Sequence, residues 1–231
     1  MVQEYVWDKE YRESKLLVKE NIASRDVVRF YEFLKKEEKV EISGLHLLDL
    51  GSGMGRNSFY FAERGANVAG LEISKTAIDI AQKNLAETMS SRVLDIRYVK
   101  QSIGEKFPFE NESFDIVLDI ISSNSLSEYE REVYLAETYR VLKSEGFFFV
   151  KTLCKDGDAN AKALLKQSPG KEKDTYIMPK MNLTERVWSK EDFIHFYQKD
   201  FKILRLEKIT RYTRMNNRSY KRNFWICYMK K

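Results

Sequence analysis

Three glycines at alternate positions, directly after a short apolar run, constrain this chain more than any other feature of its sequence. The run at residues 45–50 is dense in leucine, as a strand buried within a parallel sheet is. The alternating glycines that follow it are Gly51, Gly53 and Gly55. A loop this rich in glycine can adopt positive φ angles and lets a ligand lie against the backbone. Because residues 56–64 have helical spacing and residues 68–71 are apolar, the segment predicts a strand–helix–strand unit with a ligand-binding turn at its first crossover.

The spacing of the glycines narrows the choice of ligand. The dinucleotide fingerprint Gly-x-Gly-x-x-Gly would need a glycine where Arg56 stands, and no Lys-Ser or Lys-Thr follows as in a P-loop. Asp49, just before the loop, would repel a phosphate but suits a ligand with an amino group and a cationic sulfur. Glu72, 17 residues after Gly55, ends the second strand and is placed to accept hydrogen bonds from a ribose diol.

This combination resembles motif I and the following acidic residue of the class I S-adenosylmethionine-dependent methyltransferases. The alternative is an ordinary glycine turn near an acid in another α/β protein. The resemblance implies S-adenosylmethionine as the cofactor and S-adenosylhomocysteine as its product. The cofactor-binding residues that it implies are Asp49, Gly51, Ser52, Gly53, Gly55, Arg56, Glu72, Ile73, Ser102, Ile103 and Asp119.

Two further segments resemble particular branches of this family. Residues 107–117 are similar to the approach to the fourth strand in small-molecule enzymes of the ubiquinone-biosynthesis type. Their adenine contact usually includes an acid, but Ser102 and Ile103 occupy the aligned positions here. Residues 55–62 resemble motif I of the tellurite-resistance and thiopurine-type enzymes, with Arg56 able to approach the cofactor carboxylate.

The family resemblance also implies the overall architecture. It predicts an α/β, Rossmann-like, doubly wound seven-stranded sheet whose last strand is antiparallel. One domain over residues 1–231 fits the length, and strands and helices alternate as a parallel sheet requires. The predicted parts are an N-terminal helical cap (1–44), a cofactor-binding core (45–153), a lid insertion after strand five (154–188) and a C-terminal part (189–231). The C-terminal part is predicted to contain a helix capped by Ser189 and two final strands at 201–209 and 223–229.

Candidate acceptor-binding residues come from the cap and the insertion. Trp7 and Tyr11 are four residues apart and so share one face of a helix that either covers the cofactor or simply packs. The insertion reads as a long loop, which in a compact domain is usually a lid or binding segment. Its candidates, which can equally pack the lid down, are Tyr176, Met178, Met181 and Trp188. Asp156, Asp158 and Asn160 superficially resemble a calcium loop, but its glycine and bidentate glutamate are missing.

Methyl transfer needs alignment and desolvation more than a catalytic dyad, and no nucleophile–base pair is evident. Asp119 and Lys151 end strands four and five, so we expect them to face one crevice. These two residues are the catalytic candidates, and both are weak. They resemble a lysine–aspartate set in heat-shock RNA 2′-O-methyltransferases, but a structural ion pair is the favoured alternative. Residues 119–122 lack the Asn/Asp-Pro-Pro motif of adenine amino-methyltransferases, which argues against that activity.

Composition limits the remaining possibilities. The net charge is +5, and residues 199–231 contain 11 Lys/Arg against 2 Asp/Glu. This basic segment is usually a solvated face but can bind RNA, in which case Arg211, Arg214, Arg218 and Arg222 would carry the binding. With two histidines and two cysteines we expect no metal site, and we expect a cytoplasmic protein with no leader or membrane span.

The leading hypothesis is therefore a methyltransferase acting on a small-molecule acceptor. The alternatives are an RNA methyltransferase that uses the basic C-terminal face and a non-catalytic module that binds S-adenosylmethionine. The sequence does not indicate an oligomeric state.

Overall fold

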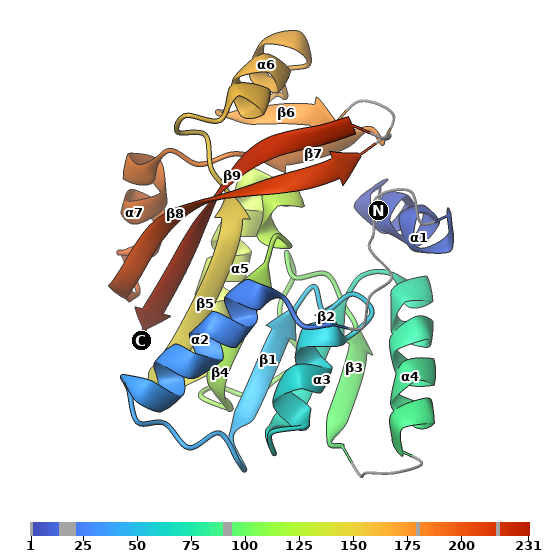
Figure 1. Ribbon diagram of the computed structural model, residues 1–231, viewed down its shortest axis with the longest axis vertical. Helices are drawn as coiled ribbons and strands as arrows, with labels where there is room; N and C mark the ends of the chain where they lie inside the picture. The colour runs from blue at the N-terminus through green and yellow to red at the C-terminus, as the bar shows by residue number, and fades with distance from the viewer. Residues whose placement is uncertain (1, 14–21, 90–93, 179–180, 216–217) are drawn as a thin grey trace.

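The computed structural model describes residues 2–13, 22–89, 94–178, 181–215 and 218–231. Its centre is a seven-stranded sheet in the order β3-β2-β1-β4-β5-β9-β8 (Figure 1). The strands are β1 (His46–Leu50), β2 (Asn67–Glu72), β3 (Ile96–Lys100), β4 (Phe114–Ile120), β5 (Leu142–Leu153), β8 (Lys202–Met215) and β9 (Arg218–Lys230). β1 to β5 are parallel, whereas β9 is antiparallel to both β5 and β8. The predicted doubly wound sheet with an antiparallel last strand is confirmed.

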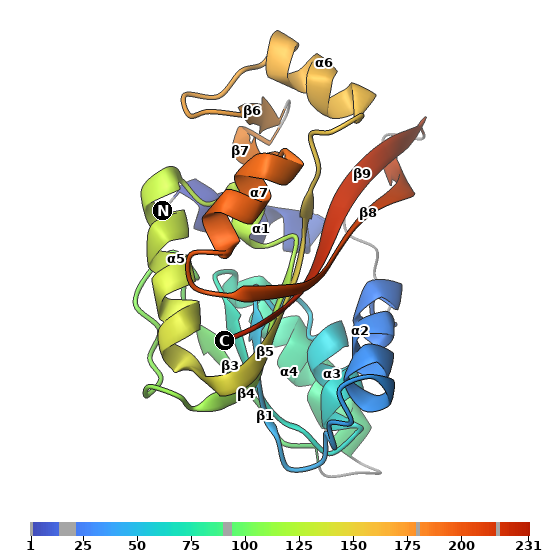
Figure 2. The same ribbon diagram turned by 90° about the vertical axis from the view of Figure 1, so that its left-hand side faces the viewer.

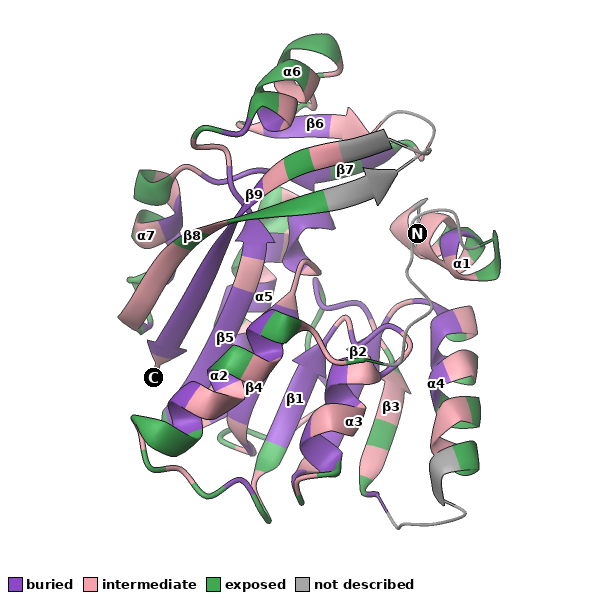
Figure 3. Ribbon diagram, viewed as in Figure 1, coloured by how far each residue is buried: buried purple, intermediate pink, exposed green. Residues whose placement is uncertain are grey.

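Helices cover both faces of this sheet (Figure 2). On one face lie α2 (Arg25–Lys36), α3 (Arg56–Ala62) and α4 (Lys75–Met89), and on the other lie α5 (Glu128–Val141) and α7 (Lys190–Tyr197). Two buried apolar clusters, one for each face, join the helices to the sheet. The central strands are almost wholly buried, as Figure 3 shows for β1, β4 and β5. Their largely apolar sequences follow from this burial on both faces.

Local sequence fixes where several helices begin. The Ser127 side chain accepts from the Glu130 amide while the Glu130 side chain accepts from the Ser127 amide, which forms a capping box at α5. Ser189 accepts from the amide of Asp192 and so caps α7, as predicted. Ser74 accepts from the amide of Ala77 at 3.1 Å, at the start of α4.

The N-terminal segment forms a helix that lies over the carboxyl ends of β1 to β3 (Figure 1). This helix, α1 (Val2–Glu13), is held at the start of α4 by Asp8. The Asp8 carboxylate accepts from the Ser74 hydroxyl and from the Thr76 amide, each at 2.9 Å. The amides in the first turn of a helix have no partner within that helix. The Asp8 carboxylate therefore acts as a cap for α4 that is supplied from another element.

The insertion differs from the loop expected for residues 154–188. It forms α6 (Ala159–Gln167) and a two-stranded hairpin of β6 (Thr175–Met178) and β7 (Leu183–Arg186). The short 3-10 helix η1 (Ser123–Ser125) follows β4, and β7 packs against it. β8 and β9 also extend well past the predicted strands, as a ribbon that reaches beyond β5.

Candidate functional site

The glycine loop between β1 and α3 forms one wall of a cavity. Gly51, Gly53 and Gly55 have φ angles of +64°, +56° and +83°, a region that side chains other than glycine rarely adopt. A Cβ on Gly53 would lie 2.6 Å from the hydroxyl oxygen of Tyr11, which belongs to α1. Glycine is therefore required both by the backbone conformation and by the close approach of the helical cap.

Glu72 ends β2 directly beside this loop. One carboxylate oxygen accepts from the amide of Gly53 and the other from the amide of Ser74, both at 2.8 Å. The side chain is buried, and this burial raises the pKa of the Glu72 carboxyl above its usual value. Each carboxylate oxygen retains a lone pair for a further donor, and Glu72 lines the cavity.

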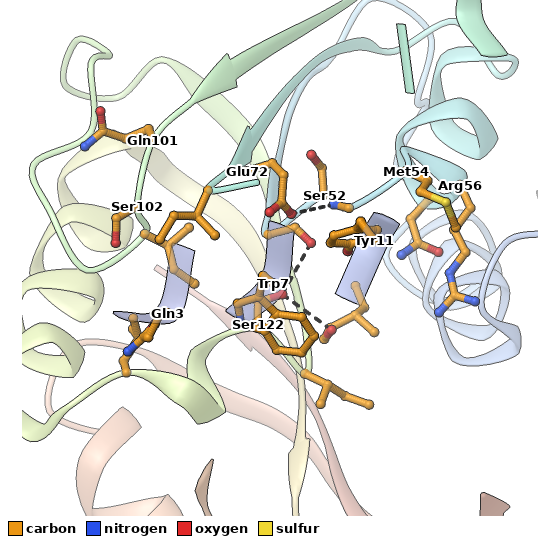
Figure 4. Close-up of a pocket in the computed structure, with 18 residues that line it drawn as sticks. Gln3, Trp7, Tyr11, Ser52, Met54, Arg56, Glu72, Gln101, Ser102 and Ser122 are labelled. Atoms are coloured by element: carbon orange, nitrogen blue, oxygen red, sulfur yellow. Dashed lines mark hydrogen bonds between the residues drawn. The ribbon is translucent and has the colours of Figure 1, made fainter. Parts of the chain in front are cut away.

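The cavity holds about 400 Å³ at the carboxyl ends of β1, β2 and β4, where the strand order reverses (Figure 4). Open α/β sheets bind their ligands at such a point. Ser52 also lines the cavity, and its buried hydroxyl has no partner among the described residues. Eight of the eleven predicted cofactor residues line the cavity: Gly51, Ser52, Gly53, Arg56, Glu72, Ile73, Ser102 and Ile103.

The other three predicted cofactor residues lie outside the wall of the cavity. Asp49 is buried beneath the loop, where its carboxylate accepts from the Ser58 hydroxyl at 2.7 Å. Burial raises the pKa of Asp49 to about 7. Gly55 supplies the left-handed turn into α3, and Asp119 is fully buried. Their roles are therefore to shape the site from behind.

Asp119 holds the chain turn that follows β4. Its carboxylate accepts from the amides of Ser122 and Ser123 at 2.9 and 3.3 Å and from the Tyr134 hydroxyl at 2.7 Å. Burial raises the pKa of Asp119 above its usual value. The carboxylate thereby fixes a turn whose neighbouring residues, Ile120 to Ser122, do line the cavity.

The expected pairing of Asp119 with Lys151 is wrong. In the register of β4 and β5, Asp119 lies beside Val150 and Ile120 lies beside Lys151. Because side chains alternate along a strand, Asp119 and Lys151 point to opposite faces of the sheet. Lys151 instead donates to the Asp26 carboxylate of α2 at 2.8 Å.

Of the predicted acceptor-binding residues, only those of the cap line the cavity. Trp7 and Tyr11 both point into it from α1 (Figure 4). Tyr176 is fully buried in the insertion and donates to the Glu185 carboxylate, and Trp188 packs among the aromatic residues of α7. Met178 and Met181 are likewise absent from the cavity wall. These side chains serve packing, Tyr176 within the insertion and Trp188 against α7.

Several lining residues were not identified from the sequence because they reach the cavity from distant parts of the chain or carry no distinctive chemistry. They are Gln3, Met54, Asn57, Gln101, Ile120, Ile121, Ser122 and Leu126. Ile121 is notable because it has a φ of +62°, which is strained for a β-branched residue. Its amide donates to the Lys151 carbonyl at 2.8 Å, and its side chain packs against the apolar cluster of the insertion. Such strain is typical of functional sites.

The basic C-terminal strands are largely engaged in ion pairs. Arg211 contacts Asp26 at 3.0 Å, Arg205 contacts Glu37 at 2.8 Å, and Arg222 lies 3.4 Å from Asp158. The side chains of Arg214 and Arg218 lie outside the described residues. The described arginines thus hold the ribbon to α2 and to the insertion, which argues against a face free to bind RNA.

The described part of the chain has neither a metal-binding cluster nor a membrane-spanning helix. Within it, no group of three His, Cys, Asp or Glu side chains is arranged to hold a metal ion. None of its helices combines the length and apolar character needed to cross a bilayer.

Comparisons with known proteins agree with this geometry. Residues 48–150 match the family model described as a methyltransferase domain. A phthiotriol/phenolphthiotriol dimycocerosates methyltransferase of Mycobacterium ulcerans is 28% identical over 132 residues, which are 56% of this chain and 45% of that protein. The match thus spans less than half the length of this relative.

Solved structures share the fold. A SAM-dependent methyltransferase of Methanosarcina mazei superposes with a TM-score of 0.70 at 18% identity, covering 82% of this chain and 93% of that one. The 1,6-didemethyltoxoflavin-N1-methyltransferase of Burkholderia thailandensis was solved with bound 1,6-didemethyltoxoflavin and S-adenosylhomocysteine. It superposes with a TM-score of 0.67 at 14% identity, covering 100% of this chain and 87% of that one. Residues 48–150 therefore form a methyltransferase domain, in a chain that shares the fold of S-adenosylmethionine-dependent methyltransferases.

Proposed function

We propose that this chain is a methyltransferase that uses S-adenosylmethionine to methylate a small-molecule acceptor. The observation that carries the proposal is the Glu72 carboxylate, oriented by the Gly53 and Ser74 amides and facing a cavity at the switch point of the sheet. A ribose diol offers two donors to such a carboxylate. The unpartnered Ser52 hydroxyl and the glycine cradle also suit a polar ligand that lies against the backbone.

Each part of the cofactor has a partner among the lining residues in this proposal. Glu72 holds the ribose, and Ser102 with Ile103 contacts the adenine. Arg56 is at the start of α3, where its guanidinium suits the methionine carboxylate. Asp49, beneath the loop, provides negative charge close to the cationic end of the molecule.

The cofactor supplies an activated methyl group and a good leaving group. The chain's task is then to align the acceptor and to exclude water. Trp7 and Tyr11 close the cavity from α1, while Asp119 fixes the turn that bears Ile120 to Ser122. No side-chain base is assigned, because Lys151 and Asp119 face opposite sides of the sheet.

A small acceptor is favoured over RNA for two reasons. The cavity is covered by the α1 cap, and the described arginines of the basic strands are already paired with carboxylates. The toxoflavin enzyme, which shares the fold, also acts on a small molecule. We further infer a reducing, cytoplasmic location, since Cys154 and Cys227 are both buried free thiols.

Calorimetric titration tests cofactor binding. We expect S-adenosylmethionine and S-adenosylhomocysteine to bind, and Glu72→Ala to weaken both by roughly a hundredfold, because two ribose hydroxyls lose a charged acceptor. Glu32→Ala is the matched control, since Glu32 lies on α2 in an exposed pair with Lys36. Binding of a pyridine dinucleotide with none of either nucleoside would contradict the proposal.

Turnover is tested separately by supplying labelled S-adenosylmethionine with small-molecule extracts, RNA or protein. We expect label in the small-molecule fraction and its loss with Glu72→Ala. Label confined to RNA would favour the nucleic-acid alternative. Cofactor binding without any transfer would favour a non-catalytic module.

A further inference from the structure

A cluster of charged side chains lies outside the wall of the cavity, where α2, β5 and β8 meet. Asp26, in the first turn of α2, is 3% exposed and accepts from Lys151 at 2.8 Å and from Arg211 at 3.0 Å. Lys151 is itself only 11% exposed. One carboxylate therefore serves two cations, and the cluster carries an excess positive charge, with Asp26 buried, Lys151 largely buried and Arg211 43% exposed.

The neighbours of this cluster add to its positive potential. Arg56 lines the cavity, and its charge is among the causes that lower the pKa of Lys151, after burial itself. The N-terminus of α2 is also here, because the Ser24 amide donates to Asn57, another lining residue. A helix N-terminus contributes a partial positive charge.

The surplus is specific to this end of the seam between α2 and the β8–β9 ribbon. Farther along, Arg205 pairs with Glu37 at 2.8 Å and Arg29 pairs with Glu207 at 3.1 Å, so each of these cations has a carboxylate. At Asp26, by contrast, Lys151 and Arg211 both pair with one carboxylate, and neither has a second carboxylate partner among the described residues. Taking an excess charge out of water is unfavourable unless a partner is supplied.

The register connects the cluster to the cavity. Lys151 lies beside Ile120 in neighbouring strands and so points to the same face, at the roughly 4.8 Å spacing of adjacent strands. Ile120 lines the cavity. A ligand that extends past Ile120 would reach the lysine and the arginine next.

We propose that the methyl acceptor is an anion whose acidic group binds at the Asp26–Lys151–Arg211 cluster. This inference rests on the proposed function, because it assigns the cofactor to the Glu72 end of the same cavity. The recognised chemistry is a carboxylate or a similar acidic group beside an apolar stem that packs on Ile120 and Ile121. The lysine and arginine then position the acceptor and do not take part in the transfer itself.

The test compares benzoate with benzamide, two probes of equal shape and different charge, on protein saturated with S-adenosylhomocysteine. We expect calorimetry to show benzoate binding at least roughly tenfold more tightly than benzamide. Lys151→Met should bring the two affinities together. Lys36→Met, a charge change at an exposed position of α2, should leave the preference intact.

Asp26→Asn separates charge recognition from a structural role. Removing the shared carboxylate increases the positive potential, so benzoate should bind more tightly while benzamide does not change. Equal affinities of the two probes, no benzoate binding at roughly 10 mM, or loss of benzoate binding in Asp26→Asn would overturn the inference. A chain that fails to bind S-adenosylhomocysteine at all would instead overturn the proposed function.

Discussion

Two buried carboxyl groups, Asp49 and Glu72, lie beneath and beside the glycine loop, and burial raises the pKa of both. Glu72 is oriented by two backbone amides, whereas Asp49 accepts from a single hydroxyl, that of Ser58. A cofactor that carries a sulfonium charge would favour the ionised forms of both groups. The site is therefore expected to couple cofactor binding to proton release.

The first prediction concerns the pH dependence of cofactor affinity. The pKa of Asp49 is about 7, so its carboxyl is mostly protonated below that pH and ionised above it. Affinity for S-adenosylmethionine should therefore rise between about pH 6 and pH 8 relative to that for S-adenosylhomocysteine, which lacks the sulfonium charge. The ratio of the two dissociation constants, measured by calorimetry, cancels the titration of their common amino group. A ratio that changes equally in Asp49→Asn would exclude Asp49 as the cause.

The second prediction concerns Gly53. An alanine there would be strained at a φ of +56° and would approach the Tyr11 hydroxyl at 2.6 Å. We expect Gly53→Ala to lower the unfolding free energy by about 1 kcal/mol or more and to weaken S-adenosylhomocysteine binding roughly tenfold. Denaturant unfolding and calorimetry measure the two effects.

Gly44→Ala is the matched control for Gly53. Gly44 has a φ of +81°, and a Cβ there meets nothing within 4 Å. It should reproduce the backbone strain while leaving cofactor affinity unchanged. Equal loss of affinity in both variants would show that the close approach of α1 to the glycine loop does not cause the weaker binding of S-adenosylhomocysteine.

Among the elements, α1 is anchored to the start of α4 through Asp8, in addition to the Glu4–Lys100 ion pair and the Gln3 hydrogen bond to the Ser125 carbonyl. Its Asp8 side chain accepts from Ser74 and Thr76 at the N-terminus of α4, which lowers the pKa of the Asp8 carboxyl despite partial burial. The same helix brings Trp7 and Tyr11 to the cavity. The anchor thus links the start of α4 to closure of the site.

The third prediction follows from this anchor. Asp8→Ala should lower the unfolding free energy by about 0.5–2 kcal/mol, as for loss of a helix cap, and should weaken S-adenosylhomocysteine binding several-fold. Hydrogen exchange should speed up across α1. Asp79→Ala removes an exposed carboxylate from α4 and should change neither affinity nor exchange. Unchanged affinity in Asp8→Ala would mean that the contact of Asp8 with the start of α4 contributes nothing to binding of S-adenosylhomocysteine.

The elements that were predicted correctly have local signals. The strand, glycine loop, helix and strand of residues 45–72 follow one another directly, and the strands and the helix each have an apolar pattern of their own. For this reason β1, α3 and β2 can be predicted from the sequence of residues 45–72. The sequence predicts a loop for the insertion because β6 and β7 are only four residues each and depend on packing, β6 against α6 and β7 against η1. The ends of β8 and β9 were missed because outside the core they lack apolar alternation.

The same distinction explains the site. Eight lining residues lie in motifs that are local in the sequence, whereas Gln3 and Ile121 reach the cavity only through the fold. The expectation for Asp119 and Lys151 was wrong because it compared strand ends without the register, which shifts the pairing by one residue. In a sheet, a shift of one residue moves a side chain to the opposite face.

Across the whole molecule, we expect one cooperative unit, since the insertion and the C-terminal strands pack on the same sheet as the core. Differential scanning calorimetry should therefore show a single unfolding transition. S-adenosylhomocysteine at roughly 100 times its dissociation constant should stabilise the folded state by about 2.7 kcal/mol, which raises the melting temperature by roughly 5–10 °C for a chain of this size. Two transitions, with only one shifted by the nucleoside, would divide the chain into separate domains.

The antiparallel direction of β9 carries the last residue away from the cavity. Lys231 is held at the end of the strands opposite to the cavity. There its amide donates to the Gly146 carbonyl, and its ammonium donates to the carbonyls of Tyr139 and Leu142. Gln3, by contrast, lines the cavity itself (Figure 4). A biosensor surface or fluorescent reporter coupled beside Lys231 would thus leave the mouth of the site facing the solution, whereas one coupled beside Gln3 would crowd it.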